Sequence, residues 1–171
     1  MHPLHIEPLQ LGHLDALATV LLCPEVYAHI EDTVPARETF VLGLQRALAG
    51  PGLANSTEKW LNFLVRDAGG SMLGRLEATV HDNLAEVAYL FGPQYWGQGW
   101  ASAGLQWLHG EIVRTTGVAD FWATTTPANV RSQRLLLRCG YSLADPPAAA
   151  LYSWEPGDLV FHCNGKGSPL V

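Results

Sequence analysis

A glycine-rich turn in the middle of the chain leads into a run with helical periodicity. The turn reads Gln94-Tyr95-Trp96-Gly97-Gln98-Gly99, and the helix expected after it extends from about Gly99 to Thr116. The first turn of a helix presents backbone N–H groups without partners inside the helix, at the positive end of its dipole. Glycines beside it let a ligand approach the backbone closely. We therefore expect the amides of Gln98 through Ala101 to bind a phosphate group.

Two well-known phosphate-binding motifs do not fit this segment. A dinucleotide-binding fingerprint requires Gly or Ala where the chain has Ser102, and an acidic residue after the next strand, Phe121 to Thr125, which offers none. A nucleotide P-loop requires Gly-Lys-Ser/Thr at the start of the helix, but the Gly-Lys pair of this chain is Gly165-Lys166. A glycine turn that binds no ligand remains the alternative for so short a pattern.

The turn resembles the pyrophosphate-binding motif Gln/Arg-x-x-Gly-x-Gly/Ala of GNAT acyltransferases. Downstream, Asn129-Val130-Arg131-Ser132 leads to Cys139-Gly140-Tyr141, which is similar to the Asn-x-x-Ser to Gly-Phe/Tyr segment of the same superfamily. Together with the strand Glu86 to Phe91 and the Pro-x-x-Trp-Gly-x-Gly pattern, this resembles the RimJ/RimL-type branch, whose named members acetylate protein N-termini. The resemblance covers Leu84 to Leu143, and it implies acetyl-CoA as co-substrate and no metal.

The resemblance also implies which residues hold the cofactor. Backbone groups at the end of the strand before the turn, where it separates from its parallel neighbour, would bond the pantetheine arm and the acetyl carbonyl. Arg131, Arg134 and Arg138 recur at helical spacing and either meet the adenosine phosphate or form a solvated face. Cofactor contacts are expected at Leu90, Phe91, Gly92, Gln94, Gly97, Gln98, Gly99, Trp100, Ala101, Asn129 and Ser132.

The chain departs from its relatives at two places. The branch usually has Thr-Glu-Ala after the turn, where this chain has Ser102-Ala103-Gly104, so the acidic residue of that motif is absent. Many superfamily members place a tyrosine, the general acid, seven residues after the asparagine, and Leu136 stands there instead. A side-chain acid must therefore come from elsewhere, and a module that binds acyl-CoA without turning it over is the alternative function.

Acetyl transfer to an amine requires a base for the nitrogen and a partner for the departing thiolate. Glu86 is the predicted base, because it shares a strand face with Ala88 and Leu90, whose apolar character would favour its protonated form. It also matches the acidic position of the family's strand, and a solvated strand carboxylate is its alternative. Ser132 is the predicted acid or thiolate partner, although a serine in the first turn of a helix is often a local hydrogen-bonding group.

The elements that must position these residues follow from the hydrophobic periodicity. Strands are expected at 4–9, 60–65, 72–80, 84–91, 121–125, 141–143, 151–154 and 158–162, and helices at 14–23, 37–49, 99–116 and 129–138. Antiparallel strands followed by strand–helix–strand units indicate an α/β fold, with helices on both faces of a mixed sheet. The resemblance implies the GNAT fold, a mostly antiparallel sheet of about six to seven strands with a central parallel pair.

Composition describes one ordered domain over 1–171, with a flexible tail expected at 164–171. Hydrophobic residues make up 48% and charged residues 15% of the chain, as in globular proteins with a sizeable core. The net charge of -6 disfavours nucleic-acid binding, which depends on clustered Lys and Arg, and suits a cationic substrate better.

Neither a secretory signal nor a membrane span is visible, so a cytoplasmic location is expected. The three cysteines, Cys23, Cys139 and Cys163, are odd in number and have no close pairing in the sequence. They argue against a disulfide framework and a four-ligand zinc site. The predicted function is acetyl-CoA-dependent transfer to a primary amine, on a protein N-terminus or a small molecule. A homodimer formed through a sheet edge or the final strands is an alternative to a monomer.

Overall fold

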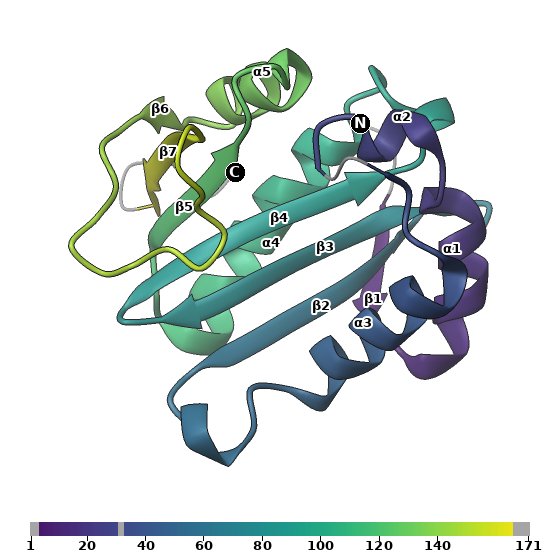
Figure 1. Cartoon of the computed structure of the whole chain (residues 1–171), viewed down its shortest axis with the longest axis horizontal. Coiled ribbons are helices and arrows are strands. Elements are labelled where there is room, and N and C mark those ends of the chain that lie inside the picture. The colour runs from purple at the N-terminus through teal and green to yellow at the C-terminus, as the bar shows by residue number, and fades with distance from the viewer. Residues whose placement is uncertain (1–3, 31–32, 166–171) are drawn as a thin grey trace.

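The computed structural model describes residues 4–30 and 33–165, which form a seven-stranded sheet with helices on both faces (Figure 1). The strand order is β1-β2-β3-β4-β5-β7-β6, and each neighbouring pair is antiparallel except β4 and β5, which are parallel. This confirms the expected mixed α/β fold. The strands are β1 (His5–Pro8), β2 (Lys59–Arg66), β3 (Met72–His81), β4 (Leu84–Phe91), β5 (Asp120–Thr125), β6 (Ser142–Leu143) and β7 (Leu159–Asn164).

The helices divide between the two faces of the sheet. In Figure 1, α1 and α3 lie on one face of the long strands, and α4 lies on the other. Within the described residues, no helix has the length and apolar character to cross a bilayer. The helices are α1 (Leu14–Leu21), α2 (Pro24–Tyr27), α3 (Arg37–Ala49), α4 (Trp100–Thr116) and α5 (Val130–Arg138), with 3-10 turns η1 (Leu11–His13), η2 (Leu53–Asn55) and η3 (Pro93–Tyr95).

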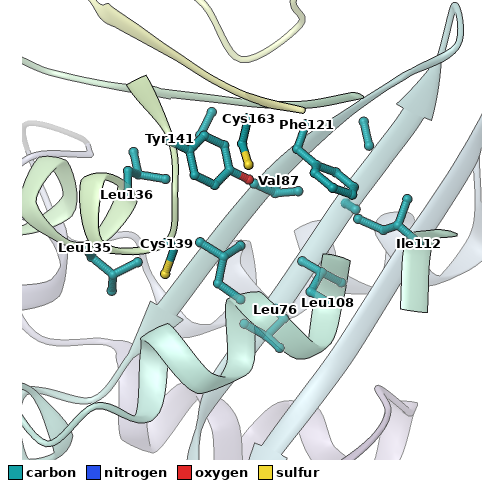
Figure 2. Close-up of a cluster of buried hydrophobic side chains, with 14 of the residues drawn as sticks. Leu76, Val87, Leu108, Ile112, Phe121, Leu135, Leu136, Cys139, Tyr141 and Cys163 are labelled. Carbon is teal, nitrogen blue, oxygen red and sulfur yellow. The ribbon is translucent and has the colours of Figure 1, made fainter. Parts of the chain in front are cut away.

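Alternation along β3 and β4 explains why both faces are covered. Side chains at successive positions of a strand point to opposite faces, so each long strand contributes to two apolar clusters. The cluster beneath α4 includes Leu76, Val87 and Phe121 (Figure 2). The cluster beneath α1 and α3 is lined by Leu64 of β2 and the apolar side of both helices. The sheet is therefore the rigid middle layer on which the site is built.

The parallel pair β4 and β5 separates soon after it begins. Backbone pairing is limited to Ala85 with Phe121 and Glu86 with Trp122, although β4 continues to Phe91 and β5 continues to Thr125. Figure 1 shows the two strands diverging towards their carboxyl ends. Side chains of both strands are thus free to line a space that passes between them.

The C-terminal third differs from the expectation in two respects. Residues 151–154 were predicted as a strand but form turns. The Leu151 side chain is buried, and the backbone N–H groups of Tyr152 and Ser153 donate to the Glu86 side chain instead of to a neighbouring strand. The tail predicted to fray from Asn164 is ordered at its start, since Asn164 pairs with Asp120 and the Gly165 N–H donates to the Ala119 carbonyl at 2.8 Å. Residues 166–171 lie outside the described residues.

The first predicted helix also ends earlier than expected. Residues 14–23 were expected to be helical up to Pro24, but α1 ends at Leu21. Pro24 then begins α2, in agreement with the preference of proline for the first turn of a helix.

Candidate active site

A cavity of about 460 Å³ lies where β4 and β5 separate. Its walls come from β4, from the end of β5, from α5, from α2 and from the segment after Leu151. Glu77 and Ala88 are cross-strand partners and project from one face of the sheet, whereas Tyr89 and its partner Leu76 project from the other face. Side chains from both faces of β3 and β4 therefore line the cavity. The cavity therefore connects the α4 and α5 side of the sheet with the α1 and α2 side. Its lining includes Glu25, His29, Glu77, Tyr89, Leu90, Phe91, Trp96, Ala101, Thr124, Asn129, Arg131, Ser132, Ser153, Glu155 and Asp158.

Two hydroxyl groups meet on the α5 side of this cavity. Asn129 caps α5, and its Oδ1 accepts a hydrogen bond from the Ser132 N–H at 3.1 Å. The Ser132 hydroxyl lies 2.8 Å from the Tyr89 hydroxyl, across from β4. Burial raises the pKa of Tyr89, so the phenol stays protonated. The predicted residue Ser132 thus lies at the cavity, and its phenol partner comes from the strand expected at 84–91.

The glycine turn presents open backbone beside the same cavity. Gly97 and Gly99 have φ of 75° and 87°, a conformation that suits glycine, and no described atom lies within 4 Å of a Cβ built on either. The helix α4 begins directly after Gly99, and Ala101 in its first turn lines the cavity. Open space next to a helix N-terminus of this length fits a pyrophosphate group.

Side chains of the turn hold it against β4. The Trp96 indole N–H donates to the Phe91 carbonyl at 2.8 Å, and the Gln98 amide donates to the Gln94 carbonyl at 2.8 Å. The Arg131 guanidinium lies 3.8 Å from the centroid of the Trp96 ring, a cation–π arrangement. Arg131 is the only Lys or Arg lining the cavity within the part of the chain that the structure describes. One positive charge is thus fixed beside the turn.

The predicted cofactor residues fall into three groups. Leu90, Phe91, Ala101, Asn129 and Ser132 line the cavity itself. Gly92 does not, because it is buried and its N–H donates to the Leu73 carbonyl at 2.9 Å. The remaining residues form the turn between Trp96 and Ala101 or flank it: Gln94, Gly97, Gln98, Gly99 and Trp100.

Glu86 has polar surroundings, so the apolar environment expected for it is wrong. Its carboxylate accepts hydrogen bonds from the Tyr152 N–H at 2.7 Å, the Ser153 N–H at 2.9 Å and the Ser153 hydroxyl at 2.5 Å. The same carboxylate lies 2.7 Å from His81 Nε2. Glu86 is 7% exposed and does not line the main cavity, but Ser153 does. The Ser153 hydroxyl therefore connects Glu86 with the cavity.

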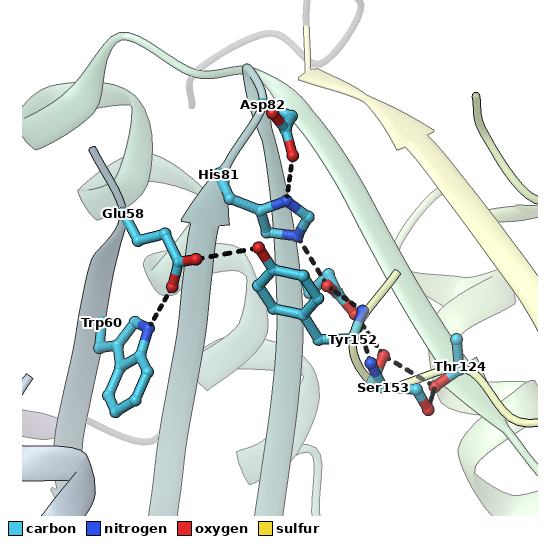
Figure 3. Close-up of polar contacts among 8 residues, drawn as sticks. Glu58, Trp60, His81, Asp82, Thr124, Tyr152 and Ser153 are labelled. Atoms are coloured by element: carbon cyan, nitrogen blue, oxygen red, sulfur yellow. Dashed lines mark hydrogen bonds and ion pairs between the residues drawn. The ribbon is translucent and has the colours of Figure 1, made fainter. Parts of the chain in front are cut away.

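His81 completes this network. Its Nδ1 lies 3.0 Å from the Asp82 carboxylate, and its ring stacks on Tyr152 with centroids 4.2 Å apart (Figure 3). Burial alone would lower the pKa of His81, but the hydrogen bonds with Asp82 and Glu86 outweigh it and raise the pKa. The segment after Leu151 is thereby fastened to β3 and β4.

Carboxylates that belong to no motif line the α1 and α2 side of the cavity. Glu77 forms an ion pair with the buried Arg75, whose pKa burial lowers to about 10, and the Glu77 side chain is 41% exposed. The others lie on α2 and in the segment after Leu151, far from the glycine turn in sequence. Only the net charge of the chain gave a signal for them. The set is Glu25, Glu77, Glu155 and Asp158.

Comparison with known proteins places this geometry in a family. The family model described as acetyltransferase (GNAT) domain matches residues 4–142. No curated protein sequence gives a significant match. Among solved structures, the GNAT-family acetyltransferase from Bacillus anthracis superposes with a TM-score of 0.74 at 16% identity, covering 97% of this chain and 98% of that chain.

Two other similar structures have named acceptors. Spermidine N-acetyltransferase from Vibrio cholerae, in complex with CoA and spermine, has a TM-score of 0.72 at 14% identity and covers 95% of this chain and 96% of that chain. The Salmonella typhimurium acetyltransferase that modifies the N-terminal serine of ribosomal protein L7/L12 has a TM-score of 0.72 at 19% identity, with coverages of 93% and 92%. At these identities the structures show a shared fold. The family match over residues 4–142 shows that this chain belongs to the GNAT acetyltransferases.

Proposed function

We propose that this acetyltransferase moves an acetyl group from acetyl-CoA to a primary amine that is cationic in solution. The observation that carries the proposal is the cavity between β4 and β5, with a phosphate-compatible turn and Arg131 on its α4 and α5 side and carboxylates on its other side. A two-substrate transfer needs both reactants held in one space so that the reacting atoms meet. The difference in charge between the two sides suits an anionic cofactor and a cationic amine.

The α4 and α5 side suits the cofactor. Acetyl-CoA, when bound, supplies the acetyl thioester that is consumed in the transfer. The first-turn amides of α4 and the Arg131 guanidinium offer positive charge for its phosphates, and Asn129 and the end of β4 offer polar backbone and side-chain groups. The V. cholerae enzyme of the same fold was solved with CoA, which supports this assignment.

The other side suits a cationic acceptor. Glu25, Glu77, Glu155 and Asp158 line it, and negative side chains in a cleft attract ammonium groups and raise their local concentration. The named acceptors of the two similar structures, a polyamine and a protein N-terminus, are both amines. These likenesses support an amine acceptor in the RimJ/RimL-type manner and leave its identity to experiment.

Proton removal is assigned to Glu86 acting through Ser153. Both oxygens of Glu86 are occupied within the network, so a proton from the cavity reaches them by way of the Ser153 hydroxyl, which donates to Glu86 at 2.5 Å. Glu77, which faces the cavity directly, is the competing carboxylate. Ser132 is proposed to stabilise the departing thiolate, since its hydroxyl lies at the cavity near the start of α5.

The experiment pairs calorimetric titration with acetyl-CoA and a thiol-release assay over a panel of amines. Parent protein is compared with Gly99→Glu, whose side chain would enter the open space at the turn. Micromolar binding that the variant loses, together with amine-dependent thiol release, is the expected result. Binding without thiol release for any amine would support the alternative, a module that holds acyl-CoA without turning it over.

A further inference from the structure

We propose that Tyr89 is a positioning residue for the transfer: its hydroxyl donates to Ser132 Oγ and thereby directs the Ser132 O–H into the cavity, towards the departing sulfur. The inference rests on the proposed function, because it concerns the leaving group of that same reaction. It adds a residue that no motif of the sequence identifies.

The geometry brings together two hydroxyl groups that lie 43 positions apart in the chain. Tyr89 extends from β4 beyond the last paired position of the parallel strands, and Ser132 lies in the first turn of α5. Their oxygens are 2.8 Å apart, and both side chains line the cavity. The Asn129 Oδ1 accepts from the Ser132 N–H at 3.1 Å and so holds the Ser132 backbone, and the hydrogen bond with Tyr89 then favours one orientation of the serine side chain.

The direction of the hydrogen bond follows from the chemistry of the two hydroxyls. A phenol is more acidic than an aliphatic alcohol and is therefore the better donor. Burial raises the pKa of Tyr89, so the phenol keeps its proton near neutral pH and can donate. The backbone carbonyl of Ser132 is a poorer acceptor for it, at 3.5 Å. With Tyr89 donating, the serine proton is left for the cavity.

Leu136 removes the phenol that many superfamily members have at its position. The family's usual tyrosine position, seven residues after Asn129, holds this leucine, which is 1% exposed and belongs to the core. It can donate no hydrogen bond. Tyr89 supplies a phenol to the cavity that Leu136 also lines, but from β4. Its hydroxyl contacts Ser132, whose own hydroxyl is then directed into the cavity.

The proton and bond balance of the step is simple. A C–N bond forms and a C–S bond breaks, without oxidation or reduction. The ammonium first loses one proton to solvent, which frees the nitrogen lone pair for attack. The second proton leaves for the base as the C–N bond forms, and it returns through water to the departing sulfur. Ser132 and Tyr89 keep their own protons and contribute hydrogen bonds that strengthen as negative charge develops on sulfur.

The test measures the ionisation of the CoA thiol when it is bound, read from the ultraviolet absorbance of the thiolate. Tyr89→Phe and Ser132→Ala are each expected to raise the pH at which the bound thiol ionises by about one unit, a tenfold loss of acidity, because a hydrogen bond to the charged form is lost. The double variant is expected to match Ser132→Ala alone, because Tyr89 acts only through Ser132.

Kinetics supply a second readout and a matched control. Tyr89→Phe is expected to lower kcat about tenfold while KM for acetyl-CoA stays within twofold. Tyr141→Phe removes another buried phenol hydroxyl, bonded to His109 at 2.7 Å in the core and away from the cavity, and is expected to leave thiol ionisation unchanged. Tyr89→Met serves as a second variant without a hydroxyl if Tyr89→Phe is unstable.

The two levels of the proposal fail differently. A parent protein that binds no CoA and releases no thiol overturns the proposed function. A parent that binds and turns over, with Tyr89→Phe showing the same thiol ionisation and kcat, overturns the role of Tyr89. A double variant clearly worse than Ser132→Ala also overturns it, because Tyr89 would then act independently of the serine.

Discussion

The carboxylate of Glu86 accepts hydrogen bonds from both the backbone N–H and the side-chain hydroxyl of Ser153, at 2.9 Å and 2.5 Å. This pair joins β4 to a segment that is 67 positions away in the chain and has no strand ladder to hold it. Because Ser153 also lines the cavity, the same contact shapes the proposed acceptor side and connects the cavity with a buried carboxylate.

Ser153→Ala tests the proposed route of the proton to Glu86. The variant removes the hydroxyl but retains the backbone N–H bond, so the segment stays anchored. We expect kcat to fall about a hundredfold, the lower end of what a positioned acid–base group contributes, with acetyl-CoA affinity unchanged. Steady-state kinetics and calorimetry measure the two effects. Ser142→Ala, in the exposed strand β6, is the control.

Comparison of Glu86→Gln with Glu77→Gln tests which carboxylate is the base. We expect Glu86→Gln to lose a hundredfold or more in kcat while binding acetyl-CoA as the parent does. Thermal melts accompany both variants, because Glu86→Gln also replaces an acceptor of two backbone N–H groups. Full activity in a folded Glu86→Gln, with loss in Glu77→Gln, would transfer the role to Glu77.

Arg131→Gln tests the cofactor side. Removal of the charge fixed over Trp96 should weaken acetyl-CoA binding about tenfold, as expected for loss of a hydrogen bond to a charged group. The matched control is Arg134→Gln, an exposed residue of the same helix that does not line the cavity. Titration calorimetry at low salt gives both dissociation constants. Equal affinities for the two variants would remove Arg131 from the cofactor site.

His81→Gln tests the coupling of stability to pH. The hydrogen bonds with Asp82 and Glu86 raise the pKa of His81 in the folded protein. Its stabilisation is therefore complete below about pH 6.5, the unfolded pKa, and is lost as pH rises through the folded pKa. Urea denaturation of both proteins should show the parent's advantage in unfolding free energy shrinking as the pH is raised stepwise from about 6.5, the unfolded pKa, into the alkaline range. A constant difference over that range would contradict this account.

Gly74→Ala tests the close approach of β3 to the end of β4. A Cβ at Gly74 would overlap the Leu90 carbonyl oxygen and lie 2.7 Å from the Phe91 Cα, so strand backbone beside the cavity must move. Overpacking of this kind costs about 1–3 kcal/mol, and we expect a comparable loss of unfolding free energy. Gly110→Ala in α4 meets no described atom within 4 Å and should gain about 0.5–1 kcal/mol. A neutral Gly74→Ala would contradict the close approach.

Much of the fold could be predicted from the sequence because its signals are local. The turn around Gly97 and Gly99, the periodicity of α4 and the alternation along β3 and β4 depend on neighbouring residues, and the structure confirms them. The predicted strand at 151–154 is wrong. Only Leu151 of this segment is buried, and the Tyr152 N–H bonds to the Glu86 side chain instead of to a neighbouring strand. Such contacts cross the chain and leave no local pattern.

The site was predictable to the same degree. Ser132 and Asn129 could be placed because they stand at a fixed spacing from a recognisable turn. Tyr89 could not, because its alternation with Val87 and Phe91 resembles a strand that packs on the core. Its proposed role depends on the separation of β4 from β5, which is a property of the folded sheet.

The central claim, acetyl transfer to a cationic amine, is tested most directly by thiol release from acetyl-CoA, with mass spectrometry of the acceptor. The acceptors are spermidine, a peptide with a free N-terminal serine and the same peptide with a blocked N-terminus and no lysine. The account predicts thiol release and an acetylated product with at least one free amine, and none with the blocked peptide. Thiol release that is equal with and without a free amine, or a folded protein that releases no thiol with any amine of a broad panel, would contradict it.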